Sequence, residues 1–234
     1  MRGLKAIAAL FLLTTGVAQA EVTGTVTVVS DYVFRGITQS AEDPALQGSV
    51  DWAHESGLYA GLWASCCLDF GSETDNEVDL YAGFAGGAEG GFGYDVGFVY
   101  YYYEPDDDDI EYFEIYLGGS YGPFDAKFWY SDDYVNSGES SEYLEANLNY
   151  PLPRDFTLIA HVGYSFGDAF DAIDNEYLDY AVGVGYSFNH FDLELKYIDT
   201  DIDEGDALFT NDEILNSEGR VFLSVSTTFP WSSE

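Results

Sequence analysis

Apolar and polar side chains alternate with a period of two residues along most of this chain. In residues 178–188, Leu178, Tyr180 and Val182 share one face of an extended strand, while Asp179 lies on the other. A period of two is the repeat of a β-strand, whereas a helix repeats every 3.6 residues. Twelve such segments follow one another, at residues 22–35, 46–52, 58–70, 77–84, 92–102, 113–120, 124–131, 144–150, 156–166, 178–188, 191–197 and 220–229.

The first twenty residues have the features of a secretory signal peptide. Arg2 and Lys5 give a positive start, residues 7–13 are apolar but too few to span a bilayer, and Ala18-Gln19-Ala20 fits a small-x-small cleavage site. We therefore expect a Sec-type signal peptide over residues 1–20 and a single exported domain over residues 21–234.

The segments and the links between them favour a closed barrel. No apolar run of about 18 residues follows the leader, so the sequence predicts no transmembrane helix. An all-β chain can cross a membrane only as a closed barrel, and bacterial barrels have an even number of strands. Short turns alternate with longer, acidic links, as expected for periplasmic and outer loops. The fold prediction is all-β, a 12-stranded antiparallel transmembrane β-barrel. A soluble β-sandwich, which also alternates, is the alternative.

Aromatic residues gather at both ends of the apolar face, as in the two girdles of an outer-membrane barrel. This pattern favours the barrel, because a sandwich does not need aromatic rings at both ends of its strands. The predicted outer girdle is Tyr32, Phe34, Phe70, Tyr100, Tyr102, Tyr130, Tyr164, Phe166 and Tyr197. The predicted inner girdle is Trp52, Phe84, Phe92, Phe124, Tyr150, Phe156, Tyr186, Phe188, Phe191 and Phe229.

The charge of the chain limits its partners. Without Arg2 and Lys5, five basic residues face 43 acidic ones. Such a charge would repel phosphate and excludes nucleic acid as a partner. An aromatic content of 18% argues against an acidic disordered chain. The expected partners are outer-membrane lipid, lipopolysaccharide and small solutes.

Charged side chains on the polar face should line the lumen. Strand closure makes the first and last segments neighbours, which places Arg35 and Arg220 close together near the outer mouth. Arg35 either links wall carboxylates and braces the barrel, or helps to form a constriction that selects solutes. The excess of acid predicts a weak preference for cations. The expected lumen and constriction residues are Asp31, Arg35, Asp51, Asp79, Asp95, Glu114, Lys127, Lys196 and Arg220.

The acidic segment from Asp199 to Asp206 is a candidate for loose divalent-cation binding. Its glycine falls one place late for a calcium loop, and its twelfth position is Thr210 rather than glutamate, so an EF-hand is not expected. Calcium or magnesium bound here could bridge the outer loops to lipopolysaccharide. The candidate ligands are Asp199, Asp201, Asp203 and Asp206. No other cofactor is expected.

Two further sequence features are interpreted as structural and not as functional. Cys66 and Cys67 are adjacent, and neighbours on a strand point to opposite faces, so we expect two small residues rather than a disulfide. Residues 163–167 match the nucleophile-elbow pattern, and Ser165 shares a face with His161. That pattern requires a strand-turn-helix, whereas Ser165 lies in an alternating segment. We therefore expect no enzyme; a barrel enzyme acting on envelope lipid is the least favoured alternative.

The segment Ser30-Asp31-Tyr32-Val33-Phe34-Arg35-Gly36, with Gln39-Ser40 and Gly57-Leu58-Tyr59-Ala60-Gly61, resembles the N-terminal signature of the TorF-type porin family of proteobacterial outer-membrane proteins. The resemblance covers about residues 28–70 and implies a channel in a Gram-negative outer membrane. The function expected is passive diffusion of small hydrophilic solutes. A barrel plugged by its own side chains, with a structural or surface-binding role, is the main alternative.

Overall fold

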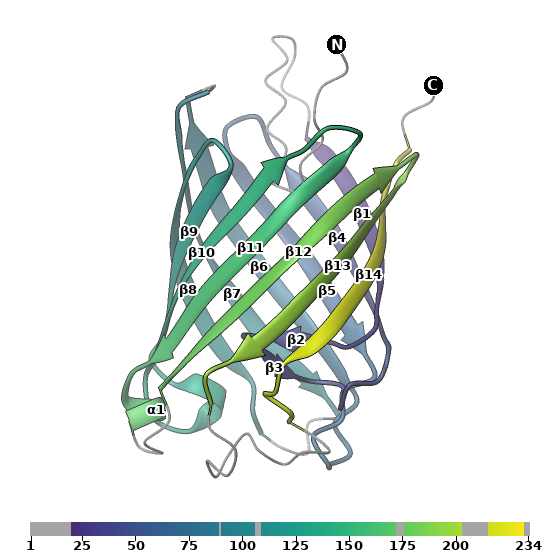
Figure 1. The fold of residues 1–234 in the computed structure, drawn as a ribbon. Helices are drawn as coiled ribbons and strands as arrows, with labels where there is room; N and C mark the ends of the chain where they lie inside the picture. The colour runs from purple at the N-terminus through teal and green to yellow at the C-terminus, as the bar shows by residue number, and fades with distance from the viewer. Residues whose placement is uncertain (1–19, 89, 106–108, 172–175, 203–214, 232–234) are drawn as a thin grey trace.

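The computed structural model describes residues 20–88, 90–105, 109–171, 176–202 and 215–231. Twelve strands, each antiparallel to its neighbours, close into one barrel (Figure 1). Closure is made by the first and last strands, where Val28 pairs with Val225. The wall strands are β1 (Glu21–Val29), β4 (Ala45–Ala53), β5 (Leu58–Cys66), β6 (Asn76–Gly87), β7 (Phe92–Glu104), β8 (Tyr112–Tyr121), β9 (Phe124–Ser131), β10 (Ser141–Pro151), β11 (Phe156–Phe166), β12 (Tyr177–Phe188), β13 (Phe191–Thr200) and β14 (Arg220–Phe229). The 12-stranded barrel prediction is confirmed.

The period of two places apolar side chains outside and polar or aromatic ones inside. On β8, Leu117 is 63% exposed on the outer surface, whereas its neighbour Tyr116 is 6% exposed inside. Val22, Leu46 and Val182 are likewise exposed on the outside. An outer surface of this kind is stable where hydrocarbon, not water, covers it. Within the described residues, no helix has the length and apolar character needed to cross a membrane.

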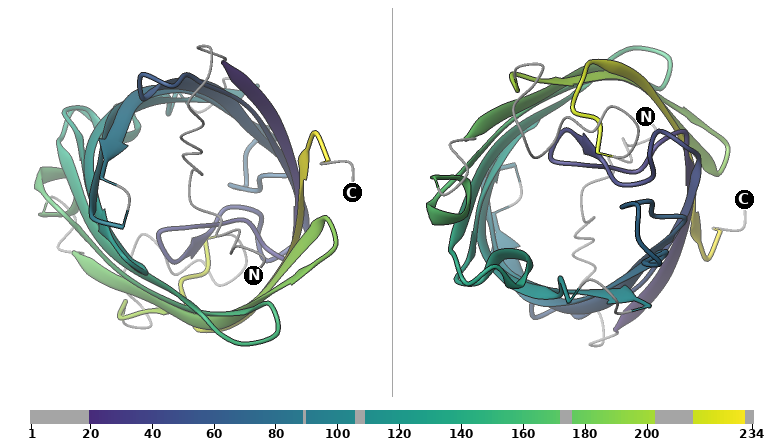
Figure 2. Two further views of the ribbon diagram at one scale, coloured as in Figure 1. Left: turned by 90° about the horizontal axis from the view of Figure 1, so that it is seen from above. Right: turned by 90° about the horizontal axis from the view of Figure 1, so that it is seen from below.

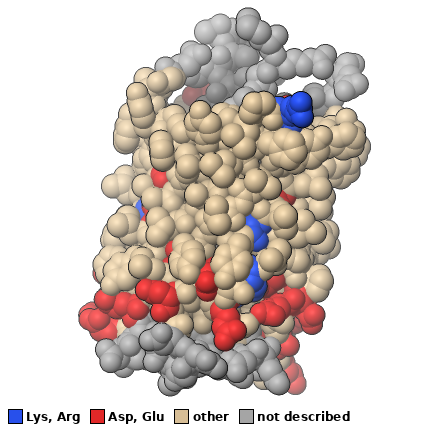
Figure 3. All heavy atoms as spheres, viewed as in Figure 1, with Lys and Arg blue, Asp and Glu red and all other residues tan. Residues whose placement is uncertain are grey.

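The two ends of the barrel differ in their connections. At the end that holds the start of β1 and the end of β14, strands are joined by short links such as residues 122–123 and 189–190. We call this the short-turn end. At the opposite end, which we call the long-loop end, the links are longer and include the short helices η1 (Tyr134–Asn136) and α1 (Asp168–Asp171). Acidic side chains gather at the long-loop end (Figure 3).

The first wall strand ends earlier than the alternation predicts. β1 stops at Val29, and the chain then folds into the barrel as a hairpin of β2 (Val33–Phe34) and β3 (Ile37–Thr38) before it returns to the wall at β4 (Figure 2). We call residues 30–44 the inward segment. Arg35 and Gly36 form its turn with φ of 48° and 84°, the positive values that a tight two-residue hairpin turn requires.

Three aromatic residues predicted for the outer girdle therefore lie elsewhere. Tyr32 packs inside the barrel against Trp63, with ring centroids 5.4 Å apart, and Phe34 packs against Tyr101 at 6.0 Å. Phe70 follows the end of β5 and packs against Tyr103. The prediction was wrong at these positions because an inward hairpin alternates in the same way as a wall strand.

The prediction for the two cysteines was also wrong, because Cys66 and Cys67 form a disulfide with each other. Adjacent side chains point to opposite faces only while the backbone is extended. β5 ends at Cys66, and Cys67 has a φ of 73°, so the second cysteine has already left the strand conformation.

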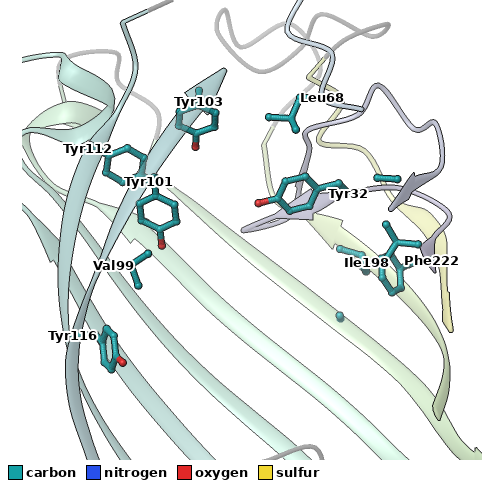
Figure 4. Close-up of a cluster of buried hydrophobic side chains, with 12 residues drawn as sticks. Tyr32, Leu68, Val99, Tyr101, Tyr103, Tyr112, Tyr116, Ile198 and Phe222 are labelled. Carbon is teal, nitrogen blue, oxygen red and sulfur yellow. The ribbon is translucent and has the colours of Figure 1, made fainter. Parts of the chain in front are cut away.

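Part of the lumen near the long-loop end is filled by a packed cluster. On one side of the interior the cluster consists of three residues of β7, Val99, Tyr101 and Tyr103. They face Tyr32 of the inward segment and Leu68 of the loop between β5 and β6 (Figure 4). The hydroxyl end of Tyr32 points toward the tyrosines of β7. The inward segment is therefore held against one side of the wall by aromatic packing.

Candidate functional site: the constricted lumen

The hairpin carries Arg35 to the opposite wall. Its Nη2 donates to both oxygens of Glu114 on β8, at 2.8 and 2.7 Å, and the side chains are 5% and 0% exposed. The guanidinium carbon also lies 4.3 Å from the centre of the Tyr143 ring. Burial favours the neutral form of Arg35, but the Glu114 carboxylate and the surrounding tyrosines, Tyr134, Tyr112 and Tyr101, together outweigh it and raise the pKa of Arg35 above its ordinary value.

A second ion pair holds the base of the hairpin. Arg220 of β14 donates from Nε to Asp31 at 2.7 Å and from Nη2 to the carbonyl of Gly36 at 3.0 Å. Thr38 donates its hydroxyl to the same Asp31 carboxylate at 2.5 Å. Burial raises the pKa of Asp31, although these hydrogen bonds oppose the shift. The inward segment is thus fixed to β8 by one arginine and to β14 by the other.

Two cavities lie in the lumen beside the hairpin. The larger, of about 530 Å³, extends from Arg35 to Thr157 at the short-turn end and is lined by charged residues such as Asp179 and Lys196. The smaller, of about 370 Å³, lies against the strands β4 to β7. Both are lined by Phe34, Tyr101 and Trp129. The hairpin therefore narrows the lumen and leaves space on two sides.

The other predicted lumen residues also point inward. Lys127 forms an ion pair with Asp95 at 3.2 Å, and its ammonium lies 4.3 Å from the Tyr116 ring. Asp51 accepts hydrogen bonds from Ser49 and Tyr81.

Lys196 and Asp79 complete the predicted set. Lys196 pairs with Glu194 at 3.0 Å and lies over Phe222. Asp79 is 8% exposed and lines the smaller cavity. Of the predicted set, Arg35 and Asp31 lie on the inward segment and not on the wall, because the first wall strand ends before them.

Several residues that line the lumen are absent from the predicted lumen set. His161 on β11 contacts Asp179 at 2.8 Å and Asn147 at 2.6 Å. Trp129 donates its indole N–H to Glu145 at 2.8 Å. The sequence signal that could identify such residues is an aromatic side chain at a polar-face position of an alternating segment. Tyr59, Trp63 and Tyr81 are examples.

The structure describes only part of the predicted metal segment. Asp199 accepts hydrogen bonds from Tyr180 and Tyr197, and Asp201 accepts one from the backbone of Leu178. Asp203 and Asp206 lie outside the described residues. Among the residues that are described, no three or more His, Cys, Asp or Glu side chains are grouped so that they could hold a metal ion. Divalent-cation binding stays a prediction.

The candidate nucleophile is placed within a strand. Ser165 lies inside β11 and is fully buried. Among the described residues, the hydrogen bonds of the His161 ring go to Tyr143, Asn147 and Asp179 and not to Ser165. This arrangement lacks the exposed serine of a nucleophile elbow. The absence of enzyme activity remains a prediction.

A closed 12-stranded barrel with an apolar exterior and a polar, constricted lumen defines a small porin-like β-barrel. Solved porins have this fold. The KdgM porin is 9% identical, with 90% of this chain and 99% of that chain covered and a TM-score of 0.57. The NanC porin is 12% identical, with 88% of this chain and 99% of that chain covered and a TM-score of 0.59. A structure of the KdgM porin in complex with disordered oligogalacturonate is also similar: it is 10% identical, with 92% of this chain and 100% of that chain covered and a TM-score of 0.56.

The chain belongs to the Gcw_chp family, described as bacterial proteins of unknown function, whose model matches residues 14–229. No curated protein sequence matches it. The family model does not use the TorF-type name, so that resemblance remains a prediction.

Proposed function

We propose that this protein is an outer-membrane porin through which small hydrophilic solutes diffuse passively, with a weak preference for cations. The observation that carries the proposal is the polarity of the barrel: apolar side chains cover the outside, and ionised ones line an interior that contains open space. The fold shared with solved porins supports a channel.

The cation preference rests on the balance of lumen charges. Within the described chain, the four inward basic residues are already paired: Arg35 with Glu114, Arg220 with Asp31, Lys127 with Asp95 and Lys196 with Glu194. Apart from Asp179 and Glu145, which lie beside His161, the other lumen carboxylates among the described residues have no basic counterpart, and a low-dielectric wall focuses their field. A negative potential in the lumen attracts cations and repels anions.

The location follows from the same features. We place the barrel in the outer membrane of a Gram-negative cell, after export by the predicted signal peptide, with the long-loop end facing outward. The acidic side chains at that end (Figure 3) would then meet lipopolysaccharide, with which calcium or magnesium could connect them.

Conductance across a planar bilayer tests the proposal. The refolded mature chain should give discrete current steps, and the reversal potential in a salt gradient should have the sign for cation flow. A reversal potential of the opposite sign would contradict the cation preference. Arg154→Gln, a change at an exposed residue of a short turn, should leave the sign unchanged and serves as the control.

The second candidate is a plugged barrel with a structural or surface-binding role and acidic loops that take up divalent cations. The tight fixation of the inward segment by two ion pairs favours it. Such a barrel would give no resolvable current at any voltage. An enzyme acting on envelope lipid is the least supported alternative, and a lipase assay with His161→Ala as the comparison would test it.

A further inference from the structure

The smaller cavity of the lumen is an aromatic chamber with one carboxylate. Its ring-bearing lining residues are Tyr32, Phe34, Trp63, Tyr81, Tyr101 and Trp129. Asp79 is the sole charged residue among the described residues that line it. Its volume of about 370 Å³ lies in the range of pockets that hold small organic molecules.

Asp79 has no ion-pair partner among the residues that the structure describes. Its Oδ1 is buried without a hydrogen bond, and so is Oε2 of Glu77, its neighbour on the inner face of β6. Neither residue takes part in an ion pair among the described residues, where the inward arginines and lysines are paired elsewhere. A buried carboxylate without a counter-charge is costly, so the chamber is suited to receive a cation.

The protein's own cations show how this lumen holds positive charge. The Lys127 ammonium lies 4.3 Å from the Tyr116 ring and 5.0 Å from the Trp129 ring, and 3.2 Å from Asp95. Arg35 is held in the same way between two rings and the Glu114 carboxylate. Aromatic faces attract cations through their quadrupole, most strongly when water is excluded. The chamber beside Asp79 offers the same combination with no side-chain cation in it.

We infer that this chamber binds small organic cations that carry an ammonium group, held by the rings of Trp63 and Tyr81 and by the carboxylate of Asp79. The inference rests on the proposed channel function and names a solute class for it. An inorganic cation would gain from Asp79 but little from the rings. A neutral sugar would gain from the rings but leave Asp79 without a counter-charge.

Choline and its neutral isostere 3,3-dimethylbutan-1-ol are suitable probes, because they differ in the charge and not in the shape of the head. Binding to the refolded mature chain in detergent is measured by calorimetry and by tryptophan fluorescence. Choline should bind, and the isostere should bind at least about tenfold more weakly, the ratio that corresponds to a cation–π contact with an ion pair. Equal binding of the two probes would overturn the inference.

Variants separate the chamber from the rest of the lumen. Asp79→Asn and Trp63→Leu should each weaken choline binding about tenfold, whereas Trp63→Phe, which keeps a ring, should lose less. Asp192→Asn removes the same charge from the larger cavity and should change choline binding little. Choline binding that is unaffected by Asp79→Asn would contradict the assignment. The heat-dependent shift in electrophoretic mobility confirms that each variant has folded.

The binding and conductance measurements can fail independently. A protein that conducts but does not bind choline would keep the channel and refute the organic-cation site. A protein that binds choline in an Asp79-dependent way but passes no current would keep the site and refute the channel.

Discussion

Arg35, at the turn of an inward hairpin, donates from one guanidinium nitrogen to both carboxylate oxygens of Glu114 on the facing wall, at 2.8 and 2.7 Å. Breaking a buried pair from one side leaves an unpaired charge and costs about 3–5 kcal/mol. We expect Arg35→Gln to lower the thermal stability of the barrel, to loosen the hairpin and to increase both the mean conductance and the current noise. Single-channel recording and a thermal melt in detergent check these effects.

A double-mutant cycle tests whether the pair acts as a unit. Glu114→Gln should have a similar effect, and the double variant should be less destabilised than the sum of the two single variants, because neither charge is then left alone. Strictly additive changes in stability would show that the two residues are not coupled. Lys196→Gln, which removes a partly exposed ion pair elsewhere in the lumen, is the control for loss of a positive charge.

The turn of the hairpin should accept no side chain at Gly36. Its φ is 84°, and a Cβ placed there would lie 2.5 Å from Cγ2 of Thr200 and 2.7 Å from Cβ of Asp179. Gly36→Ala should therefore push the hairpin away from the wall and reproduce the conductance change of Arg35→Gln. Gly138→Ala has nearly the same φ, 82°, but open space around it. Both variants place alanine at a positive φ, so the difference between them reports the steric clash at Gly36 alone. Equal changes in conductance for Gly36→Ala and Gly138→Ala would argue against a steric effect.

The disulfide predicts a defined pattern of thiol chemistry. Under denaturing conditions without a reductant, iodoacetamide should not modify the purified chain, because Cys66 and Cys67 are joined to each other and the chain has two cysteines. After reduction, mass spectrometry should find both residues alkylated. Modification of both cysteines before reduction would show that the bond is absent.

The outer surface should tolerate no charge in the middle of a strand. Leu117, near the centre of β8, is 63% exposed, and arginine on the lipid face of a barrel costs about 2–4 kcal/mol at the midplane. Leu117→Arg should lower the free energy of unfolding in lipid vesicles by this amount. Thr157→Arg, on the lumen side, should cost far less and should weaken the cation preference. Equal losses would contradict the assignment of the two faces.

The fold was predictable because alternation over twelve segments leaves few alternatives, and the pairing of consecutive strands then follows from chain order. The first loop was not predictable in this way. Tyr32 and Phe34 continue the alternation of β1, so the period cannot distinguish a wall strand from a hairpin that folds inward. The difference depends on the partners Trp63 and Tyr101, which are distant in sequence.

For the candidate site, the sequence predicts which side chains point inward but not which of them meet. Arg35 and Glu114 are separated by 79 residues, and their contact depends on the register of the barrel and on the depth of the hairpin. The disulfide was missed for a local reason: the backbone at Cys67 leaves the extended conformation, and its neighbours include no proline or glycine that would signal the change.

The clamp on the base of the hairpin comes from β14, the last strand of the wall, through Arg220. Arg220 lies next to Asp31 because β14 pairs with β1 and so closes the barrel. The fixation of the inward segment at its base therefore depends on the pairing of β1 with β14, and a barrel whose seam is open would lack this attachment.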